Sequence, residues 1–279
     1  TVGVVGSGQM GTGIGLVAAR NAGLAVRFYD QNAAQLTKSS QFIDKLLAKD
    51  ISKGKLDETS AQTIKSRISS SDDLGTLGDC EVVIEAATEN TDLKLRLFSQ
   101  LSSLTRPDTI LATNTSSISI TKIAAATAHP ENVIGMHFMN PVPVMKLVEI
   151  IPGLATSSET LAKTKQLAEA MAKVCTTSQD TPGFIANRLL MPYINEAVIC
   201  LQEGIATRED IDTTMKLGTN NPMGPLTLAD FIGLDTCLAI MRVLHNELGD
   251  SKYRPSPLLV KYVDAGWLGK KSGRGFYQY

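Results

Sequence analysis

The sequence predicts an α/β protein in which a doubly wound parallel sheet domain is followed by an all-helical domain. In the first part of the chain, short valine- and isoleucine-rich runs alternate with longer segments of helical periodicity, which is typical of β-α-β units. Beyond the Thr-Pro-Gly sequence at 181–183, almost every segment has helical spacing of its apolar residues. We therefore expect a sheet domain at residues 1–181 and a helical domain at residues 182–279.

The amino terminus carries the most informative motif. Residues 2–11 read VGVVGSGQMG, a short apolar strand that runs into a glycine-rich turn. A helical pattern follows at 10–22, and a second strand at 26–29 ends on Asp30. A strand, G-x-G-x-x-G, a helix, a strand and a terminal acid together predict a Rossmann-type dinucleotide-binding unit, a context that an ordinary glycine turn lacks.

The glycines and the acid of this unit each have a physical role. Gly6 permits the tight turn, Gly8 lets the backbone approach a pyrophosphate, and Gly11 allows helix and strand to pack closely. The free N–H groups of the helix N-terminus bind the anion. Asp30 is expected to accept hydrogen bonds from the adenosine ribose and to repel a 2′-phosphate. Since no arginine follows Asp30 directly, the sequence favours NAD over NADP.

Polar side chains follow the other predicted strands of this domain, at 82–86, 110–113 and 133–138. Ligands lie at the carboxyl ends of the strands in such sheets, so these side chains are candidates for a site. They are Glu89, Lys94, Asn114, Ser116 and His137. Each also has a purely structural interpretation, as a solvated acid or lysine, a helix cap, or a packing histidine.

Glu149 lies in an extended segment, 144–151, with apolar neighbours on both sides. A buried carboxylate needs a partner, and His137 is a better candidate than His129 or His245, which fall in a connection and a late helix. A histidine can take the proton of a hydroxyl group while hydride leaves its carbon. The carboxylate would orient the ring and stabilise its charged form.

Residues from about 33 to 68 predict a helical arm, with two helices joined around 52–56. Near its turn the arm carries Lys45, Lys49, Lys53 and Lys55. Two interpretations are equally open: a solvated helix face, or a patch that binds a phosphorylated substrate.

Composition excludes several classes of protein. The apolar fraction of 43% and charged fraction of 20% are those of a soluble globular protein, and no apolar run is long enough to span a membrane. A net charge of −1 gives no general attraction to nucleic acid or anionic membranes. The cysteines form no metal pattern, so no metal is expected, and we expect them to be buried free thiols in a reducing compartment. They are Cys80, Cys175, Cys200 and Cys237. A start at Thr1, inside a predicted strand, is compatible with loss of a targeting segment and leaves the compartment open.

Taken together and in order, the motifs resemble the 3-hydroxyacyl-CoA dehydrogenase family, which includes 3-hydroxybutyryl-CoA dehydrogenases. The most specific segments are GMHFMNP at 135–141, KLVE at 146–149 and PGFIANR at 182–188. The resemblance implies NAD-dependent oxidation of an (S)-3-hydroxyacyl-CoA, of short chain, to the 3-ketoacyl-CoA, or the reverse. It also implies a homodimer formed through the helical domain, located in the cytoplasm if bacterial and in the mitochondrial matrix or peroxisome if eukaryotic.

The resemblance further implies roles for single residues. His137 matches the general base of the family and Glu149 its partner acid, while Ser116 and Asn187 match the residues that hold the substrate oxygens. Lys53 matches a lysine that contacts coenzyme A. The positions that match NAD contacts are Gly6, Gly8, Gln9, Met10, Gly11, Asp30, Glu89, Lys94, Asn114, Ser116, Asn140 and Lys271.

One departure from the family concerns the arm, where a family serine that contacts coenzyme A aligns with Leu46.

Two alternative functions belong to other classes. One is a dehydrogenase of free hydroxy acids with a catalytic lysine, against which the pairing of His137 with Glu149 argues. The other is a non-enzymatic relative that kept the fold, such as an eye-lens crystallin, against which the complete catalytic set argues.

Overall fold

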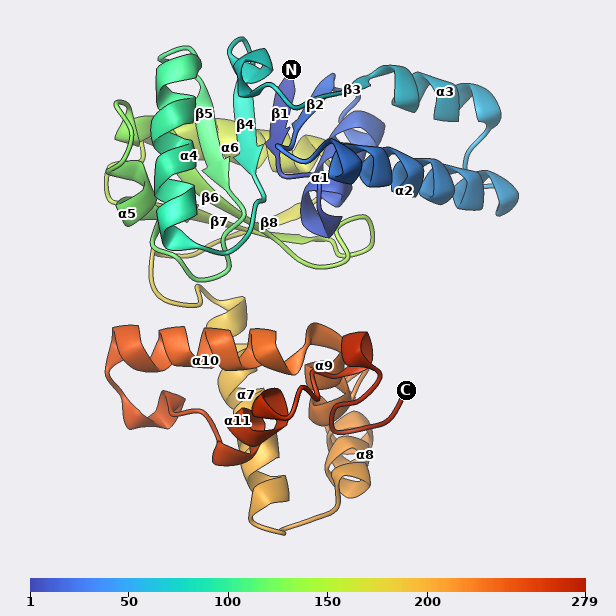
Figure 1. The fold of residues 1–279 in the computed structure, drawn as a ribbon, viewed down its shortest axis with the longest axis vertical. Helices are drawn as coiled ribbons and strands as arrows, with labels where there is room; N and C mark the ends of the chain where they lie inside the picture. The colour runs from blue at the N-terminus through green and yellow to red at the C-terminus, as the bar shows by residue number, and fades with distance from the viewer. The chain divides into compact units, whose positions relative to one another are not determined.

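The computed structural model describes residues 1–279, which form two compact units, Thr1–Thr181 and Pro182–Tyr279 (Figure 1). The first unit is a Rossmann-type sheet covered by helices, and the second consists of helices. The predicted fold class is therefore confirmed. No helix combines the length and apolar character needed to cross a membrane.

The sheet of the first unit has the strand order β3-β2-β1-β4-β5-β6-β7-β8. Strands β1 to β6 pair in parallel, β7 is antiparallel to β6, and β8 is parallel to β7. The chain runs outward from β1 in both directions, so the strand order reverses between β1 and β4, where such sheets bind ligands. The strands are β1 Val2–Val5, β2 Val26–Tyr29, β3 Ile68–Ser71, β4 Val82–Glu85, β5 Ile110–Thr113, β6 Val133–Phe138, β7 Leu147–Pro152 and β8 Val174–Thr177.

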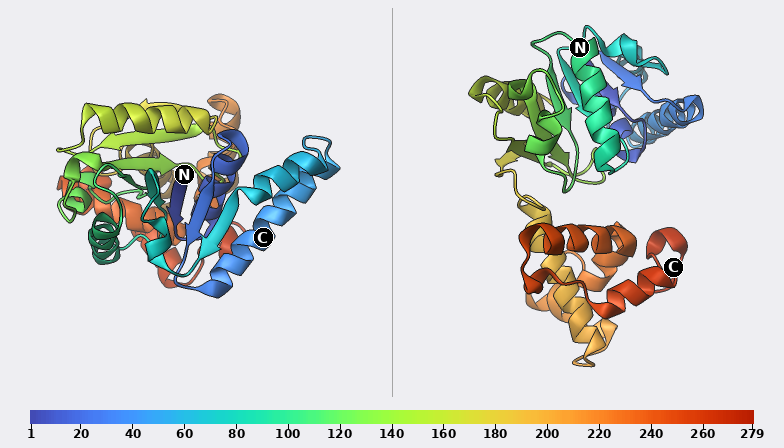
Figure 2. Two further views of the ribbon diagram at one scale, coloured as in Figure 1. Left: turned by 90° about the horizontal axis from the view of Figure 1, so that it is seen from above. Right: turned by 60° about the vertical axis from the view of Figure 1, so that its left-hand side comes forward.

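Helices cover both faces of this sheet (Figure 2). The core on one face joins α1, α6 and the base of α2 to the strands, while α4 and α5 pack on the other face. The helical elements of the unit are α1 Gln9–Asn21, α2 Ala33–Ser52, α3 Glu58–Ser66, η1 Leu74–Leu77, α4 Thr91–Leu104, α5 Ile120–Ala124, η2 Pro130–Asn132 and α6 Ser158–Ala170.

Helices α2 and α3 form an arm that projects from the sheet beside β3 (Figure 1). Each begins at a side-chain cap, with Asn32 accepting from the N–H of Ala34 and Asp57 from that of Ser60. Ile43 and Ile64 are buried, which fixes the two helices against the sheet edge.

The second unit is built on one apolar core of helical side chains. Its elements are α7 Ala186–Gln202, α8 Arg208–Gly218, α9 Pro225–Ile232, α10 Leu234–Leu248, η3 Ser251–Tyr253, α11 Pro257–Asp264 and η4 Lys270–Ser272. Buried Asp230 accepts hydrogen bonds from the N–H groups of Phe276 and Tyr277, which fastens the carboxyl-terminal tail to α9.

The four cysteines are free thiols, as predicted, but they are not all buried. Cys80 and Cys237 are buried, whereas Cys175 and Cys200 are only partly covered. Burial raises the pKa of the Cys237 thiol to about 12, so it stays protonated at neutral pH.

Candidate active site

The glycine loop after β1 opens into a cavity of about 420 Å³. No side chain caps the N-terminus of α1, and a Cβ placed on Gly8 would meet no atom within 4 Å. The backbone there can therefore approach a bound anion, which the uncapped N–H groups favour. A Cβ on Gly11 would collide with the carbonyl oxygen of Gly6, because helix and loop touch at this point. The loop fits a dinucleotide pyrophosphate.

Asp30, at the end of β2, lines the same cavity. Its Oδ2 accepts hydrogen bonds from the N–H and the hydroxyl of Ser7, at 2.9 and 3.0 Å, and its Oδ1 accepts from the N–H of Asn32. The carboxylate thus holds the glycine loop. Sequence reasoning missed Ser7, since any residue is allowed at that place in the motif.

A buried ion pair lies at the carboxyl end of β4. The Lys94 ammonium is 2.7 Å from Glu85 Oε1, both side chains are almost completely buried, and the Thr113 hydroxyl donates to Glu85 Oε2. The same ammonium is 3.4 Å from Glu89 Oε2. Lys94 is therefore engaged by two carboxylates. Glu85 was not among the predicted site residues, although an acid that ends an apolar strand was a signal for it.

Glu89 organises the turn that follows β5. Its Oε1 accepts from the hydroxyl of Thr115 at 2.5 Å and from the N–H of Ser116 at 2.8 Å. Asn114 accepts from the N–H of Phe138 at 2.8 Å, which ties the end of β5 to the end of β6. The structure thus places Glu89, Asn114 and Ser116 together at the strand ends.

His137 and Glu149 face each other across β6 and β7, where they are direct partners in the antiparallel register. His137 Nδ1 lies 2.8 Å from Glu149 Oε2, and their exposed fractions are 6% and 0%. An ionised carboxylate can only accept, so Nδ1 carries the proton and the carboxylate fixes the ring tautomer. The pairing inferred from the apolar setting of Glu149 is present.

The loop after β6 begins at Asn140, whose Oδ1 accepts from Gln9 Nε2 at 3.0 Å. Gln9 is the first residue of α1, and Met10 beside it lines the cavity of the glycine loop. Asn140 is thereby placed next to the N-terminus of α1.

The remaining predicted residues belong to the arm and to the second unit. Lys53 caps the C-terminus of α2 and is exposed at the tip of the arm. In the second unit, Asn187 is buried in the first turn of α7, and Lys271 pairs with Asp235 at 2.6 Å.

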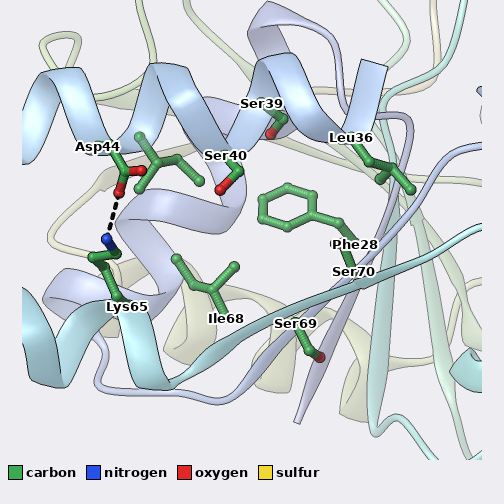
Figure 3. A pocket seen from close by; sticks show the side chains of 10 residues that line it. Phe28, Leu36, Ser39, Ser40, Asp44, Lys65, Ile68, Ser69 and Ser70 are labelled. Atoms are coloured by element: carbon green, nitrogen blue, oxygen red, sulfur yellow. Dashed lines mark ion pairs between the residues drawn. The ribbon is translucent and has the colours of Figure 1, made fainter. Parts of the chain in front are cut away.

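A second cavity, of about 100 Å³, lies between α2, α3 and β3 (Figure 3). Apolar side chains such as Phe28 and Ile68 line it together with serine hydroxyls, and the ion pair of Asp44 with Lys65 stands at one side. None of the predicted site residues lines this cavity.

Comparison with known families agrees with this architecture. Residues 1–181 match the model of the NAD-binding domain of 3-hydroxyacyl-CoA dehydrogenase, and residues 183–279 match the model of its C-terminal domain. The chain belongs to the 3-hydroxyacyl-CoA dehydrogenase family. The predicted family and the predicted cofactor, NAD, are confirmed.

Individual relatives are similar over almost their full length. The chain is 58% identical over 276 residues to a Bacillus subtilis protein named "Probable 3-hydroxybutyryl-CoA dehydrogenase", covering 99% of this chain and 96% of the relative. The structure is similar to that of (S)-3-hydroxybutyryl-CoA dehydrogenase PaaH1 from Ralstonia eutropha, with 48% identity, a TM-score of 0.96 and coverage of 100% and 98%. It is also similar to FadB2 from M. tuberculosis, with 43% identity, a TM-score of 0.97 and coverage of 100% and 98%.

Proposed function

We propose that the protein is an NAD-dependent dehydrogenase that interconverts (S)-3-hydroxyacyl-CoA and 3-ketoacyl-CoA esters of short chain, such as 3-hydroxybutyryl-CoA. The observation that carries the proposal is the buried His137–Glu149 pair on β6 and β7. It lies in the same sheet as the glycine loop and Asp30, which follow β1 and β2. The identity of 58% to a relative named for 3-hydroxybutyryl-CoA supports the acyl group.

The chemistry follows from the position of the proton on His137. NAD⁺, when bound, would supply the hydride acceptor for the carbon that carries the substrate hydroxyl. That hydroxyl must lose its proton in the same step, and the Nε2 atom of His137 is suited to take it, because Nδ1 faces Glu149. Glu149 keeps the ring oriented and stabilises the positive charge that it acquires. In the reverse direction, His137 returns the proton to the forming hydroxyl.

The other predicted residues are proposed to bind and orient the substrate and NAD. We propose that Ser116 and Asn187 hold the substrate oxygens, and that the NAD contacts follow the positions derived from the family resemblance. The hydrogen bonds that Glu89 accepts from Thr115 and Ser116 support this role for the turn after β5, because they fix its backbone before a ligand arrives.

The lysines of the arm are proposed to bind the phosphates of coenzyme A. All four are exposed and none forms an ion pair, so their charge is available to a ligand. They are Lys45, Lys49, Lys53 and Lys55. A patch of unpaired cations attracts phosphates over roughly 10 Å at moderate salt.

We also propose a homodimer formed through the second unit, in a reducing compartment. The support is that large apolar side chains stand exposed there, among them Leu189 at 69%, Ile205 at 67% and Leu217 at 75%. A second copy of the chain would remove them from water. Light scattering at several concentrations tests this, and a monomer throughout would contradict it.

Substrate comparison is the direct test of function. The purified protein should oxidise NADH with acetoacetyl-CoA, fastest with short chains in a series of 3-ketoacyl-CoA esters, and only very slowly with free acetoacetate. Faster turnover of the free acid would favour the dehydrogenase of unactivated hydroxy acids. No NADH oxidation with any thioester would favour the non-enzymatic relative.

A further inference from the structure

Lys173 is a buried lysine without a carboxylate partner. It lies between α6 and β8 and is 7% exposed. Its ammonium donates hydrogen bonds to the carbonyl oxygens of Val142 at 2.5 Å and Met145 at 2.8 Å, and it forms no ion pair. Both acceptors belong to one segment, the β6–β7 loop at residues 139–146.

Burial of this charge is costly. An ammonium group loses its hydration when it is buried, and two neutral carbonyls replace only part of it. Burial accordingly lowers the pKa of Lys173. An apolar side chain of similar length would avoid this cost, so the hydrogen bonds of Lys173 act on the shape of the β6–β7 loop and not on net stability.

The loop has two other fixed points. Val142 is buried against α1, where a Cβ on Gly13 would come within 2.8 Å of the Val142 Cβ. At its start, Asn140 accepts from Gln9. The side chains of Val144 and Met145, by contrast, are 71% and 42% exposed, so their own burial does not hold the tip of the loop. Within the loop, the N–H groups of Val144 and Met145 donate to the carbonyl oxygen of Pro141. Lys173 adds a hold from outside the loop, through the carbonyl oxygens of Val142 and Met145.

The position of the loop relative to the cofactor follows from the sheet order. Asp30 ends β2 and the glycine loop follows β1, so the adenosine half of a dinucleotide lies over these strands. The nicotinamide half would then be bound at the ends of β4, β5 and β6. The β6–β7 loop begins where β6 ends. Asn140 is the first polar side chain of that loop.

We propose that Lys173 is a positioning residue for the nicotinamide half of NAD: by holding the carbonyls of Val142 and Met145, it fixes the β6–β7 loop so that Asn140 meets the cofactor. The inference rests on the proposed function in one respect, the assignment of Asn140 to NAD. It adds a role for a residue in α6–β8, a region that contributes no predicted site residue.

The test compares two ligands by calorimetric titration in the absence of substrate. NADH carries the nicotinamide, whereas ADP-ribose carries only the adenosine, pyrophosphate and ribose part. Lys173→Met keeps the length of the side chain and removes the donors, so it should weaken NADH about tenfold and leave ADP-ribose within about twofold. Lys173→Arg, which keeps donors, should recover part of the loss. Lys163→Met, which changes an exposed lysine of α6, is the matched control and should alter neither ligand.

A purely structural role would weaken both ligands together or neither, and either result would overturn the proposal. If Lys173→Met does not fold, Gly13→Ala is used in its place, because its methyl group would push on Val142 and so displace the same loop. It should likewise weaken NADH more than ADP-ribose. Asn140→Ala should reproduce the selective loss of NADH. These titrations contain no thioester, so they test the role of Lys173 separately from the substrate series. The titrations can contradict the role of Lys173 while acetoacetyl-CoA is turned over normally, and the substrate series can contradict the proposed function while the titrations support that role.

Discussion

Glu149 Oε2 lies 2.8 Å from Nδ1 of His137, and the two residues are direct partners in the β6–β7 register. Neighbouring strands set this distance, so the pair is formed before a substrate arrives. It follows that the histidine presents a fixed tautomer to the strand ends.

Replacing the histidine tests its role in proton transfer. His137→Gln should lower kcat by on the order of 10²-fold to 10⁴-fold, because the hydroxyl proton no longer has an acceptor. The affinity for NADH, measured by titration, should barely change. Turnover like that of the unmodified protein would move the base elsewhere, and Glu89 would be the next candidate.

Glu149 should act only through His137. Glu149→Gln can still orient the ring but cannot stabilise its positive charge, so kcat should fall strongly while the circular dichroism spectrum stays the same. In the double variant with His137→Gln, the glutamate change should cost almost nothing more, since coupled residues are not additive. Full additivity of the two losses would show that the residues act independently.

Asp30 should set the choice of cofactor by its charge. Asp30→Asn keeps an oxygen that can accept from Ser7 and removes the repulsion of a 2′-phosphate. The ratio of NADH to NADPH affinity should therefore fall by about tenfold or more. Ser7→Ala removes one donor and keeps the charge, so it should leave this ratio unchanged. An equal loss for both cofactors in Asp30→Asn would refute the assignment.

The arm lysines should affect KM only for substrates that carry the phosphates of coenzyme A. Changing Lys49, Lys53 and Lys55 to glutamine should raise KM for acetoacetyl-CoA and leave NADH binding unaffected. KM for acetoacetyl-pantetheine, which lacks the nucleotide, should not move. Lys122→Gln, which changes an exposed lysine of α5, is the control. If KM for acetoacetyl-CoA is also insensitive to added salt, the lysines are only a solvated face.

Lys173 predicts a pH dependence of stability. Burial lowers its pKa in the folded protein from the usual 10.5. At pH values between the pKa of the folded state and that of the unfolded state, the unfolded chain therefore binds more protons. The free energy of unfolding contributed by this group therefore rises with pH through that window, and the cost is fully present below it. Relative to Lys173→Met, the unmodified protein should gain stability in denaturant titrations as the pH rises toward the ordinary lysine pKa of 10.5. Parallel curves for the two proteins would contradict this.

Local patterns in the sequence predicted much of the fold. The strands that it predicted correctly are apolar and buried, and the glycine motif with its terminal acid is a local signal. Strands β3 and β8 were missed because they are largely exposed and rich in serine or threonine, so they lack the apolar run or alternation that marks a strand.

For the site, the sequence by itself indicated the residues that end strands, because parallel strands bring their carboxyl ends to one edge whatever the details of packing. It also paired Glu149 with His137, since a carboxylate among apolar residues requires a partner. Only the tertiary structure decided which groups hold those residues in place: Ser7 on Asp30, Glu85 on Lys94, and Lys173 on the loop of Asn140. Ser7 and Asp30, and likewise Lys173 and Val142, are far apart in the sequence and become neighbours only through the fold, so no local pattern of residues records these contacts. Glu85 and Lys94 are only nine residues apart, but their pairing depends on how α4 packs after β4.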